Sequence, residues 1–118
     1  MMNLAIYHSN ETVNEILEEF IDAYYGQRMH YFASDLLKED FTPEEIMTSV
    51  RRAMSICRAA GVDVRPHFNL VYTTLEGAII KDCKLSKFSY ALVLLNGPSN
   101  NATVADWQVQ LVNSFLNK

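Results

Sequence analysis

Apolar and acidic residues recur at helical spacing between residues 12 and 25. The tetrapeptide Thr12-Val13-Asn14-Glu15 matches the capping box that opens many helices, and Gly26 is a natural stop. One face of the predicted helix carries Val13, Ile16, Leu17, Phe20, Ile21 and Tyr24, and the opposite face carries Glu11, Glu15, Glu18, Glu19 and Asp22. The pattern therefore predicts an acidic amphipathic helix over residues 12–25.

A second amphipathic helix is predicted to begin at Thr42. The tetrapeptide Thr42-Pro43-Glu44-Glu45 places a capping hydroxyl, a proline and an acid at the positions that favour a helix start. Gly61 ends this helix. Between the two helices, residues 31–38 are predicted to be short and partly helical, with Ser34 as a possible N-cap. The inward positions of the second helix are Ile46, Met47, Val50, Ala53, Met54 and Cys57.

The middle of the chain favours β-structure. Residues 70–75 are rich in β-branched and aromatic side chains, Glu76-Gly77 has the composition of a turn, and residues 78–80 predict a second short strand. These segments predict one β-hairpin over about residues 69–81. Because an isolated hairpin is only marginally stable in water, this hairpin must pack on helices.

Two more helices complete the predicted fold. Residues 85–95 are apolar nearly all round, which is typical of a buried helix, and an apolar stripe predicts a last helix over about residues 102–116. The order of elements predicts an α+β fold, mainly helical, with the hairpin packed between helices. We expect an acidic helical arm at residues 1–30 and an α+β module at residues 31–118.

The net charge is an average over two unlike halves. The 118-residue chain is 49% hydrophobic and 20% charged, which excludes a disordered tail. Its formal net charge of −4 taken alone argues against nucleic-acid binding. However, residues 1–45 hold ten acids and two bases, whereas residues 46–118 hold four acids and eight bases. The charge therefore leaves binding of nucleic acid by the later part of the chain open.

The sequence predicts a cytoplasmic protein. No apolar run reaches the roughly 18 residues that a membrane helix needs. Residues 1–10 lack the charged and apolar regions of a signal peptide. Cys57 and Cys83 form no CxxC pair, so we expect two free thiols.

Three arginines lie on the helix that begins at Thr42. Arg51 and Arg58 share the face opposite the apolar stripe, and Arg52 flanks them. A row of this kind can lie along a phosphate backbone. The alternative is an ordinary solvated helix face.

Three lysines lie near the predicted start of the 85–95 helix. Lys84 and Lys87 are at or just inside that start, Lys81 comes just before it, and Asp82 is the expected cap. A helix start carries partial positive charge and unpaired N–H groups, so this arrangement suits an anion such as a phosphate. The alternative is three flexible, exposed lysines.

Few residues suggest an enzyme. His8, His30 and His67 have no short metal-ligand spacing among themselves or with the cysteines. The chain contains no HExxH, GxSxG or P-loop motif. We expect His67 to hydrogen-bond a loop carbonyl, and we expect neither a catalytic residue nor a metal or other cofactor.

Several short segments together resemble one family. The chain is similar to the Bro-N-like N-terminal domain of damage-inducible protein D and of phage and viral antirepressors. The resemblance covers roughly residues 31–116. The matching segments are ASDLL at 33–37, RRAMSIC at 51–57, PHF at 66–68, KDCKLSKFSYALVLLNG at 81–97 and WQVQLVNSF at 107–115.

The resemblance implies a small α+β module without catalytic activity. It implies binding of DNA, or of a DNA-bound protein, in the bacterial DNA-damage response or in phage regulation. Six residues occupy positions that match the family, and the resemblance implies that they belong either to the shared scaffold or to the shared surface. These residues are Arg51, Arg52, His67, Asp82, Lys84 and Lys87.

Two hypotheses follow for the function. In the first, the chain binds DNA, and phosphates contact Arg51, Arg52, Arg58, Lys81, Lys84 and Lys87. In the alternative, the chain is a protein-interaction module whose partner surface is the acidic helix face at Glu15, Glu18 and Glu19. The position of the acidic helix distinguishes them, because a helix packed over the basic residues would block DNA.

Overall fold

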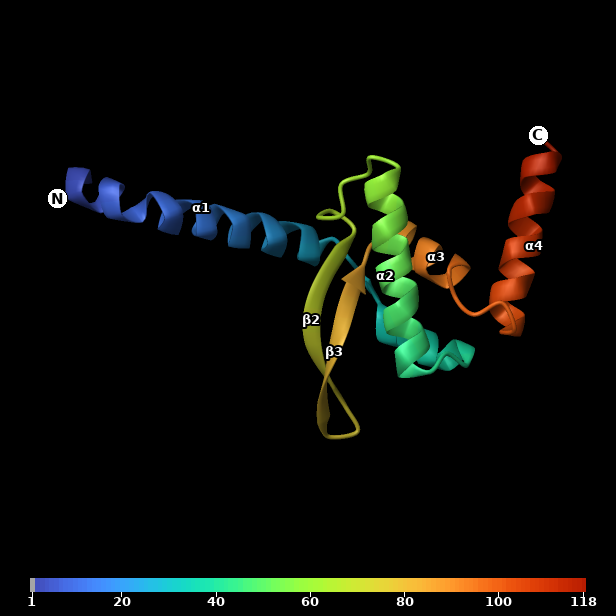
Figure 1. The fold of residues 1–118 in the computed structure, drawn as a ribbon. Coiled ribbons are helices and arrows are strands. Elements are labelled where there is room, and N and C mark those ends of the chain that lie inside the picture. The colour runs from blue at the N-terminus through green and yellow to red at the C-terminus, as the bar shows by residue number, and fades with distance from the viewer. Residues whose placement is uncertain (1) are drawn as a thin grey trace.

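Helices dominate the fold, and one small sheet lies among them (Figure 1). The computed structural model describes the backbone of residues 2–118 and the side chains of residues 13–118. The elements are α1 (Met2–Gln27), β1 (Tyr31–Phe32), the 3-10 helix η1 (Ala33–Glu39), α2 (Pro43–Ala59), β2 (Phe68–Leu75), β3 (Ala78–Leu85), α3 (Lys87–Leu95) and α4 (Ala102–Leu116). The predicted α+β class is confirmed.

The sheet is antiparallel and has the strand order β1-β3-β2. Its hairpin turns at Glu76 and Gly77, whose φ angles of 51° and 81° both lie in the left-handed region. A two-residue turn of this kind matches the twist of the flanking strands, and glycine adopts it without strain. The hairpin spans residues 68–85, longer than the predicted 69–81, and the strand at Tyr31–Phe32 was not predicted.

Helix α2 forms as its sequence predicts. The Thr42 hydroxyl accepts a bond of 3.1 Å from the Glu45 amide, and the Glu45 carboxylate accepts one of 2.9 Å from the Thr42 amide. This reciprocal pair is a capping box. Helix α2 buries Ile46, Ser49, Val50, Ala53 and Cys57 on one face.

One hydrophobic core joins α2 to η1, the sheet and α3. The aromatic ring of Phe41 lies directly against Gly97, so only a glycine fits there. The largest fully buried apolar side chains are Leu36 from η1 and Leu85 from β3. The other core members are Ala33, Phe41, Ile46, Val50, Ala53, Cys57, Phe68, Cys83, Val93, Leu94 and Val104.

The predicted start of the third helix is wrong. Strand β3 continues to Leu85, where it pairs with both Phe68 and Tyr31, so these residues cannot begin a helix. The N-cap of α3 is Ser86, whose hydroxyl accepts a bond of 3.1 Å from the Ser89 amide. Asp82 is therefore not a cap of α3.

Two other sequence-based expectations are also corrected. Ser34 does not cap η1, because Phe32 occupies the N-cap position and its amide donates to Asp35 at 3.0 Å. Helix α3 is buried on one side only, at Ser89, Val93 and Leu94, whereas Phe88 is 48% exposed.

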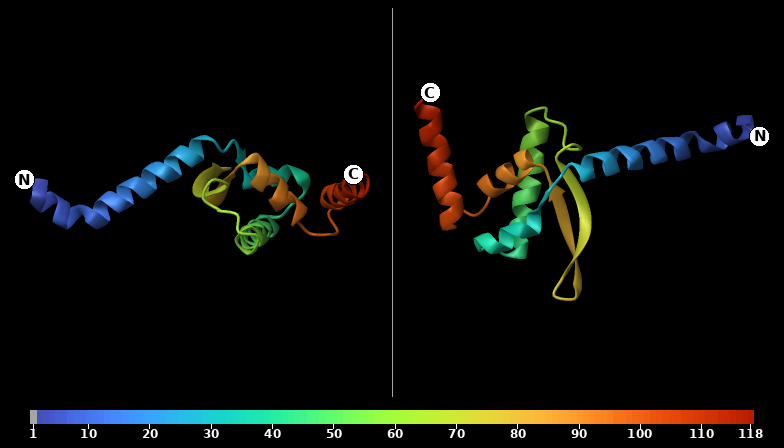
Figure 2. Two further views of the ribbon diagram at one scale, coloured as in Figure 1. Left: turned by 90° about the horizontal axis from the view of Figure 1, so that it is seen from above. Right: turned by 180° about the vertical axis from the view of Figure 1, so that it is seen from behind.

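Helices α1 and α4 project from the rest of the molecule in different directions (Figure 2). The predicted bounds of α4 agree with the structure, but α1 begins well before the predicted start at Thr12. The Cα radius of gyration is 18.1 Å, against about 13–14 Å for a compact domain of this length. The accessible surface is 8606 Å², against about 6,500 Å² for a compact monomer of this mass. The fold therefore exposes much more surface than its size requires.

None of the helices described is both long enough and apolar enough to span a membrane.

Candidate functional site

The apolar stripe of α1 faces solvent. Phe20 is 68% exposed, and Ile16 and Leu17 are 58% and 53% exposed. Val13 and Tyr24 are about half exposed as well. Large apolar side chains gathered on one exposed face mark an interaction site more often than an ordinary surface.

The polar side of α1 is uniformly acidic over its described side chains. Glu15, Glu18, Glu19 and Asp22 are exposed, and no basic residue lies between residues 13 and 27. The predicted partner surface at Glu15, Glu18 and Glu19 is therefore accessible. It lies along an equally accessible apolar stripe.

Among its described side chains, residues 13–27, helix α1 contacts the body near its C-terminal end. Asp22 accepts a bond of 3.1 Å from the Arg65 guanidinium, and this contact raises the pKa of Arg65. Gly26 lies so close to the Asn69 side chain that a Cβ there would be 2.7 Å from the amide nitrogen. Arg65 was not among the predicted site residues, since no local pattern shows that it meets Asp22.

The acidic helix does not cover the arginines of α2. Helix α1 approaches β2 and then extends away from α2 (Figures 1 and 2). Arg51, Arg52 and Arg58 are all exposed. The acidic helix of the same chain therefore leaves the three arginines of α2 open to solvent.

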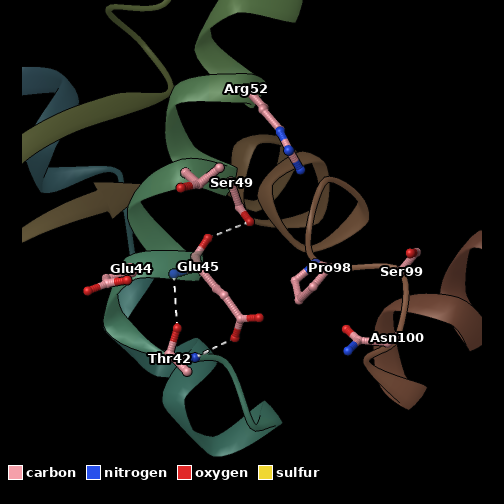
Figure 3. A pocket seen from close by; sticks show the side chains of 9 residues that line it. Thr42, Glu44, Glu45, Ser49, Arg52, Pro98, Ser99 and Asn100 are labelled. Atoms are coloured by element: carbon pink, nitrogen blue, oxygen red, sulfur yellow. Dashed lines mark hydrogen bonds between the residues drawn. The ribbon is translucent and has the colours of Figure 1, made fainter.

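The three arginines do not form one surface. Arg51 and Arg58 lie on the exposed side of α2, where Arg51 donates a long bond of 3.4 Å to Thr48. Arg52 turns toward the end of α3 and reaches the Asn96 carbonyl at 3.5 Å (Figure 3). Arg51 and Arg58 therefore form the row along the exposed side of α2, and Arg52, which is also exposed, lies beside it and is turned toward α3.

The lysines do not lie at a helix start as predicted. Lys81 and Lys84 belong to β3, and only Lys87 is in α3, as its first residue. The Lys84 ammonium lies 5.9 Å from the centroid of the Phe32 ring, within the range of a cation–π contact. The predicted placement of Lys81 and Lys84 at a helix start is therefore wrong, because extended β-structure replaces the expected first turn.

A polar pocket of about 610 Å³ lies between the start of α2 and the loop that follows α3 (Figure 3). Some of its polar groups already have partners within the chain. Thr42 and Glu45 form the capping box, and the Ser49 hydroxyl donates a bond of 2.7 Å to the Glu45 carbonyl. These bonds stabilise the helix start, whereas Glu44, Ser99 and Asn100 also line the pocket and make no side-chain hydrogen bond to the described residues.

Asp82 is a structural carboxylate. It is 2% exposed and accepts bonds from the Ser34 amide at 3.0 Å and the Ser34 hydroxyl at 2.5 Å. The Thr73 hydroxyl and the Cys83 amide also donate to it, at 3.1 and 2.8 Å. Asp82 thus joins β3 to the first turn of η1, a role that sequence spacing did not reveal.

His67 and two serines form the polar cluster nearest to a catalytic arrangement. The Nδ1 atom of His67 lies 2.7 Å from the Ser86 hydroxyl, and the Ser89 hydroxyl donates a bond of 2.5 Å to the His67 carbonyl. No carboxylate is hydrogen-bonded to the His67 ring among the described side chains. The expected partner of His67, a loop carbonyl, is replaced by the hydroxyl that caps α3. This arrangement holds the loop to the helix start.

Both thiols are free and buried. Burial raises the pKa of Cys83 to about 11, and it also raises the pKa of Cys57. A raised pKa keeps a thiol protonated and unreactive. No cluster of His, Cys, Asp and Glu within the described side chains has the arrangement of a metal site.

Comparisons of the chain with models of protein families, with curated proteins and with solved structures found no match. The surfaces of the described residues are the remaining observations that bear on function. The most prominent of them are the exposed apolar faces of the two projecting helices.

Proposed function

We propose that the protein is a small regulatory module that binds a protein partner through α1. The observation that carries the proposal is the exposed apolar stripe of α1, which the body of the same chain leaves uncovered. An amphipathic helix of this kind docks its apolar face into a groove on a partner, and residues at helical spacing serve as anchors. Phe20, at the centre of the stripe, is the expected main anchor.

The charge of α1 defines the chemistry of the partner. Glu15, Glu18 and Glu19 flank the apolar stripe, so the matching groove is apolar with lysines or arginines at its rim. Rim charges mainly raise the association rate, whereas the buried apolar anchors slow dissociation. The resemblance to Bro-N-like domains favours a DNA-bound or DNA-processing protein as the partner. It favours a role without catalysis.

The experiment uses the immobilised full chain to capture a partner from a cell extract. Mass spectrometry identifies the partner, and its affinity is then measured with purified protein. Reversing the charge of Glu15, Glu18 and Glu19 should slow association, and Phe20→Glu should weaken binding about 30-fold or more. The control is Glu76→Lys, an exposed acid at the hairpin turn.

Two results would contradict the proposal. One is a partner whose affinity is indifferent to both changes in α1. The other is an equal loss of affinity in the Glu76→Lys control, which would indicate a general effect of net charge.

Direct binding of DNA is the second candidate. The observation that favours it is the open row of Arg51 and Arg58 on α2, which α1 does not cover. Fluorescence anisotropy of a labelled duplex should then show affinity that falls steeply with salt. In the double variant Arg51→Glu with Arg58→Glu, the plot of log affinity against log salt concentration should be less steep, with a slope smaller by about two.

Lys38→Glu changes an exposed basic residue outside that row and is the control for the DNA measurement. An absence of binding even at low salt would exclude this candidate. The protein-binding proposal would be unaffected.

A further inference from the structure

Helix α4 has more apolar surface than the chain covers. Only Val104, in its first turn, is buried. The rest of its large apolar residues are half exposed or more: Trp107, Val109, Leu111, Val112, Phe115 and Leu116. These residues are spread around more than one side of the helix. Contact with the body along a single side therefore cannot bury them all.

The first turns of α4 fix its position. The Asn101 side chain donates a bond of 2.7 Å to the Glu39 carbonyl, and Gln108 donates one of 2.9 Å to the Leu95 carbonyl. Beyond Gln108 no hydrogen bond or ion pair joins α4 to the described side chains of the body, and residues 109–118 are all exposed. The apolar second half of the helix is therefore held out in a defined direction.

An apolar groove of about 420 Å³ runs between α3 and α4. Tyr90, Leu94, Trp107 and Leu111 lie along it. At one end, the ring of Tyr31 stacks on that of Tyr90 with 5.0 Å between centroids. The groove is thus a preformed apolar surface next to a helix whose own apolar residues are uncovered.

The near absence of charge on α4 indicates which kind of partner its exposed apolar face can bind. The helix contains a single charged residue, Asp106, and it has no charge from Trp107 to Asn117. Pairing two copies of the uncharged segment of α4 brings no like charges together along the helices, and among the described residues the one charged residue that lines the neighbouring groove is Lys87. Pairing two copies of α1 would bring Glu15, Glu18, Glu19 and Asp22 near their equivalents, which costs free energy. Self-association is therefore favoured at α4 and disfavoured at α1.

The chain exposes more surface than a compact monomer of its mass needs. The surface exceeds that of a compact monomer by about 2,100 Å². The six apolar residues of α4 that are half exposed or more contribute to this excess.

We propose that α4 is the interface of a two-fold symmetric dimer. The second half of α4 from one copy lies along the α3–α4 groove of the other copy, and the reverse contact forms at the same time. Such an isologous interface is closed, so assembly stops at two chains. Leu111, Val112 and Phe115 are the residues that it buries. The proposal is independent of partner binding through α1.

Analytical ultracentrifugation of the full chain over a concentration series tests the dimer. The wild type should sediment at about 27 kDa, twice the chain mass of 13.5 kDa, and should dissociate on dilution. Phe115→Glu should raise the dimer dissociation constant by about 100-fold or more, because symmetry repeats the change in both copies.

Phe20→Glu is a matched control, since Phe20 and Phe115 are both 68% exposed. This variant should remain a dimer. Phe115 contributes nothing to the buried core, so Phe115→Glu should fold, and circular dichroism checks that it does.

Trp107 gives a second readout. It is the only tryptophan in the chain and is 50% exposed beside the groove. Its emission should shift to longer wavelength as the wild type is diluted, and Phe115→Glu should show the shifted emission at every concentration. Three results would overturn the proposal. The wild type could be monomeric at about 100 μM, or Phe20→Glu could disrupt the dimer while Phe115→Glu does not. The third is a Trp107 emission maximum that does not change with protein concentration.

Discussion

Helices α1 and α2 have similar amphipathic patterns and opposite surroundings. In α2 the inward residues Val50 and Ala53 are 1% and 0% exposed. In α1 the corresponding stripe faces water, and Phe20 is 68% exposed. Periodicity therefore predicts that a helix forms and which face is apolar. It does not predict whether the same chain covers that face.

Helix α4 combines both situations within one element. Its first turn buries Val104 in the core, whereas Phe115 three turns later is 68% exposed. The core of η1, α2, the sheet and α3 is complete without the second half of α4 or most of α1. The projecting helices hold surplus apolar surface, and this surplus is what the two proposed interactions use.

The largest expected effect comes from a matched pair of leucines. Leu36→Ala, in the core, should lower the free energy of unfolding by about 2–5 kcal/mol, because Leu36 is fully buried. Leu17→Ala, in α1, should change it by less than about 0.5 kcal/mol, because Leu17 is 53% exposed. Chemical denaturation of both variants measures the difference. Equal losses would show that α1 is packed against the body.

Asp82→Asn tests the link between the sheet and η1. The amide group cannot accept all the bonds that the carboxylate accepts from Ser34 and Thr73. We expect a loss of about 2–3 kcal/mol in the free energy of unfolding. Asp106→Asn, at an exposed acid of α4, is the control and should be nearly neutral. A neutral Asp82→Asn would contradict the structural role of Asp82.

The buried thiol of Cys83 predicts a pH dependence. Burial raises its pKa from 9.0 to about 11, so the unfolded chain releases the proton first as the pH rises. The stabilisation is complete below pH 9 and is lost as the pH rises from there through 11, by about 2 kcal/mol at pH 11. Comparing the wild type with Cys83→Ala across this range isolates the thiol from tyrosines and lysines. Parallel curves of unfolding free energy against pH for the two proteins would contradict the prediction.

The smallest effect concerns the capping box of α2. Thr42→Ala removes the hydroxyl that accepts from the Glu45 amide, and we expect a loss of about 1 kcal/mol. Thr74→Ala, at an exposed position of β2, is a reference change of the same side chain. A thermal melt of each variant makes the comparison, and a Thr42→Ala melt identical to wild type would refute the cap.

Local signals predicted much of the fold. Thr42-Pro43-Glu44-Glu45 marked the start of α2, Glu76-Gly77 marked the hairpin turn, and the bounds of α4 followed from its apolar period. Each of these depends on neighbours in the chain. The fold class followed from the order of the elements.

Features that depend on distant contacts were not predicted. Leu85 is drawn into β3 by its pairing with Phe68 and Tyr31, and this moved the start of α3 away from Lys84. Asp82 meets Ser34 across 48 residues of chain, and Arg65 meets Asp22 across 43. No spacing rule reveals such pairs. For the same reason Lys81 and Lys84 were assigned to a helix start, although both lie in β3 and only Lys87 begins α3.

Hydrogen–deuterium exchange of the whole chain at two protein concentrations tests the contrast between body and projecting helices most directly. Amides of α2 and β3 should exchange slowly at both concentrations, because the core protects them. Amides of α4 should exchange slowly only at the higher concentration, where the dimer forms. Amides of α1 should exchange fast at both concentrations, because a helix without tertiary packing is only marginally stable. Slow exchange in α1 at the lower concentration, or exchange in α4 that ignores concentration, would contradict this account.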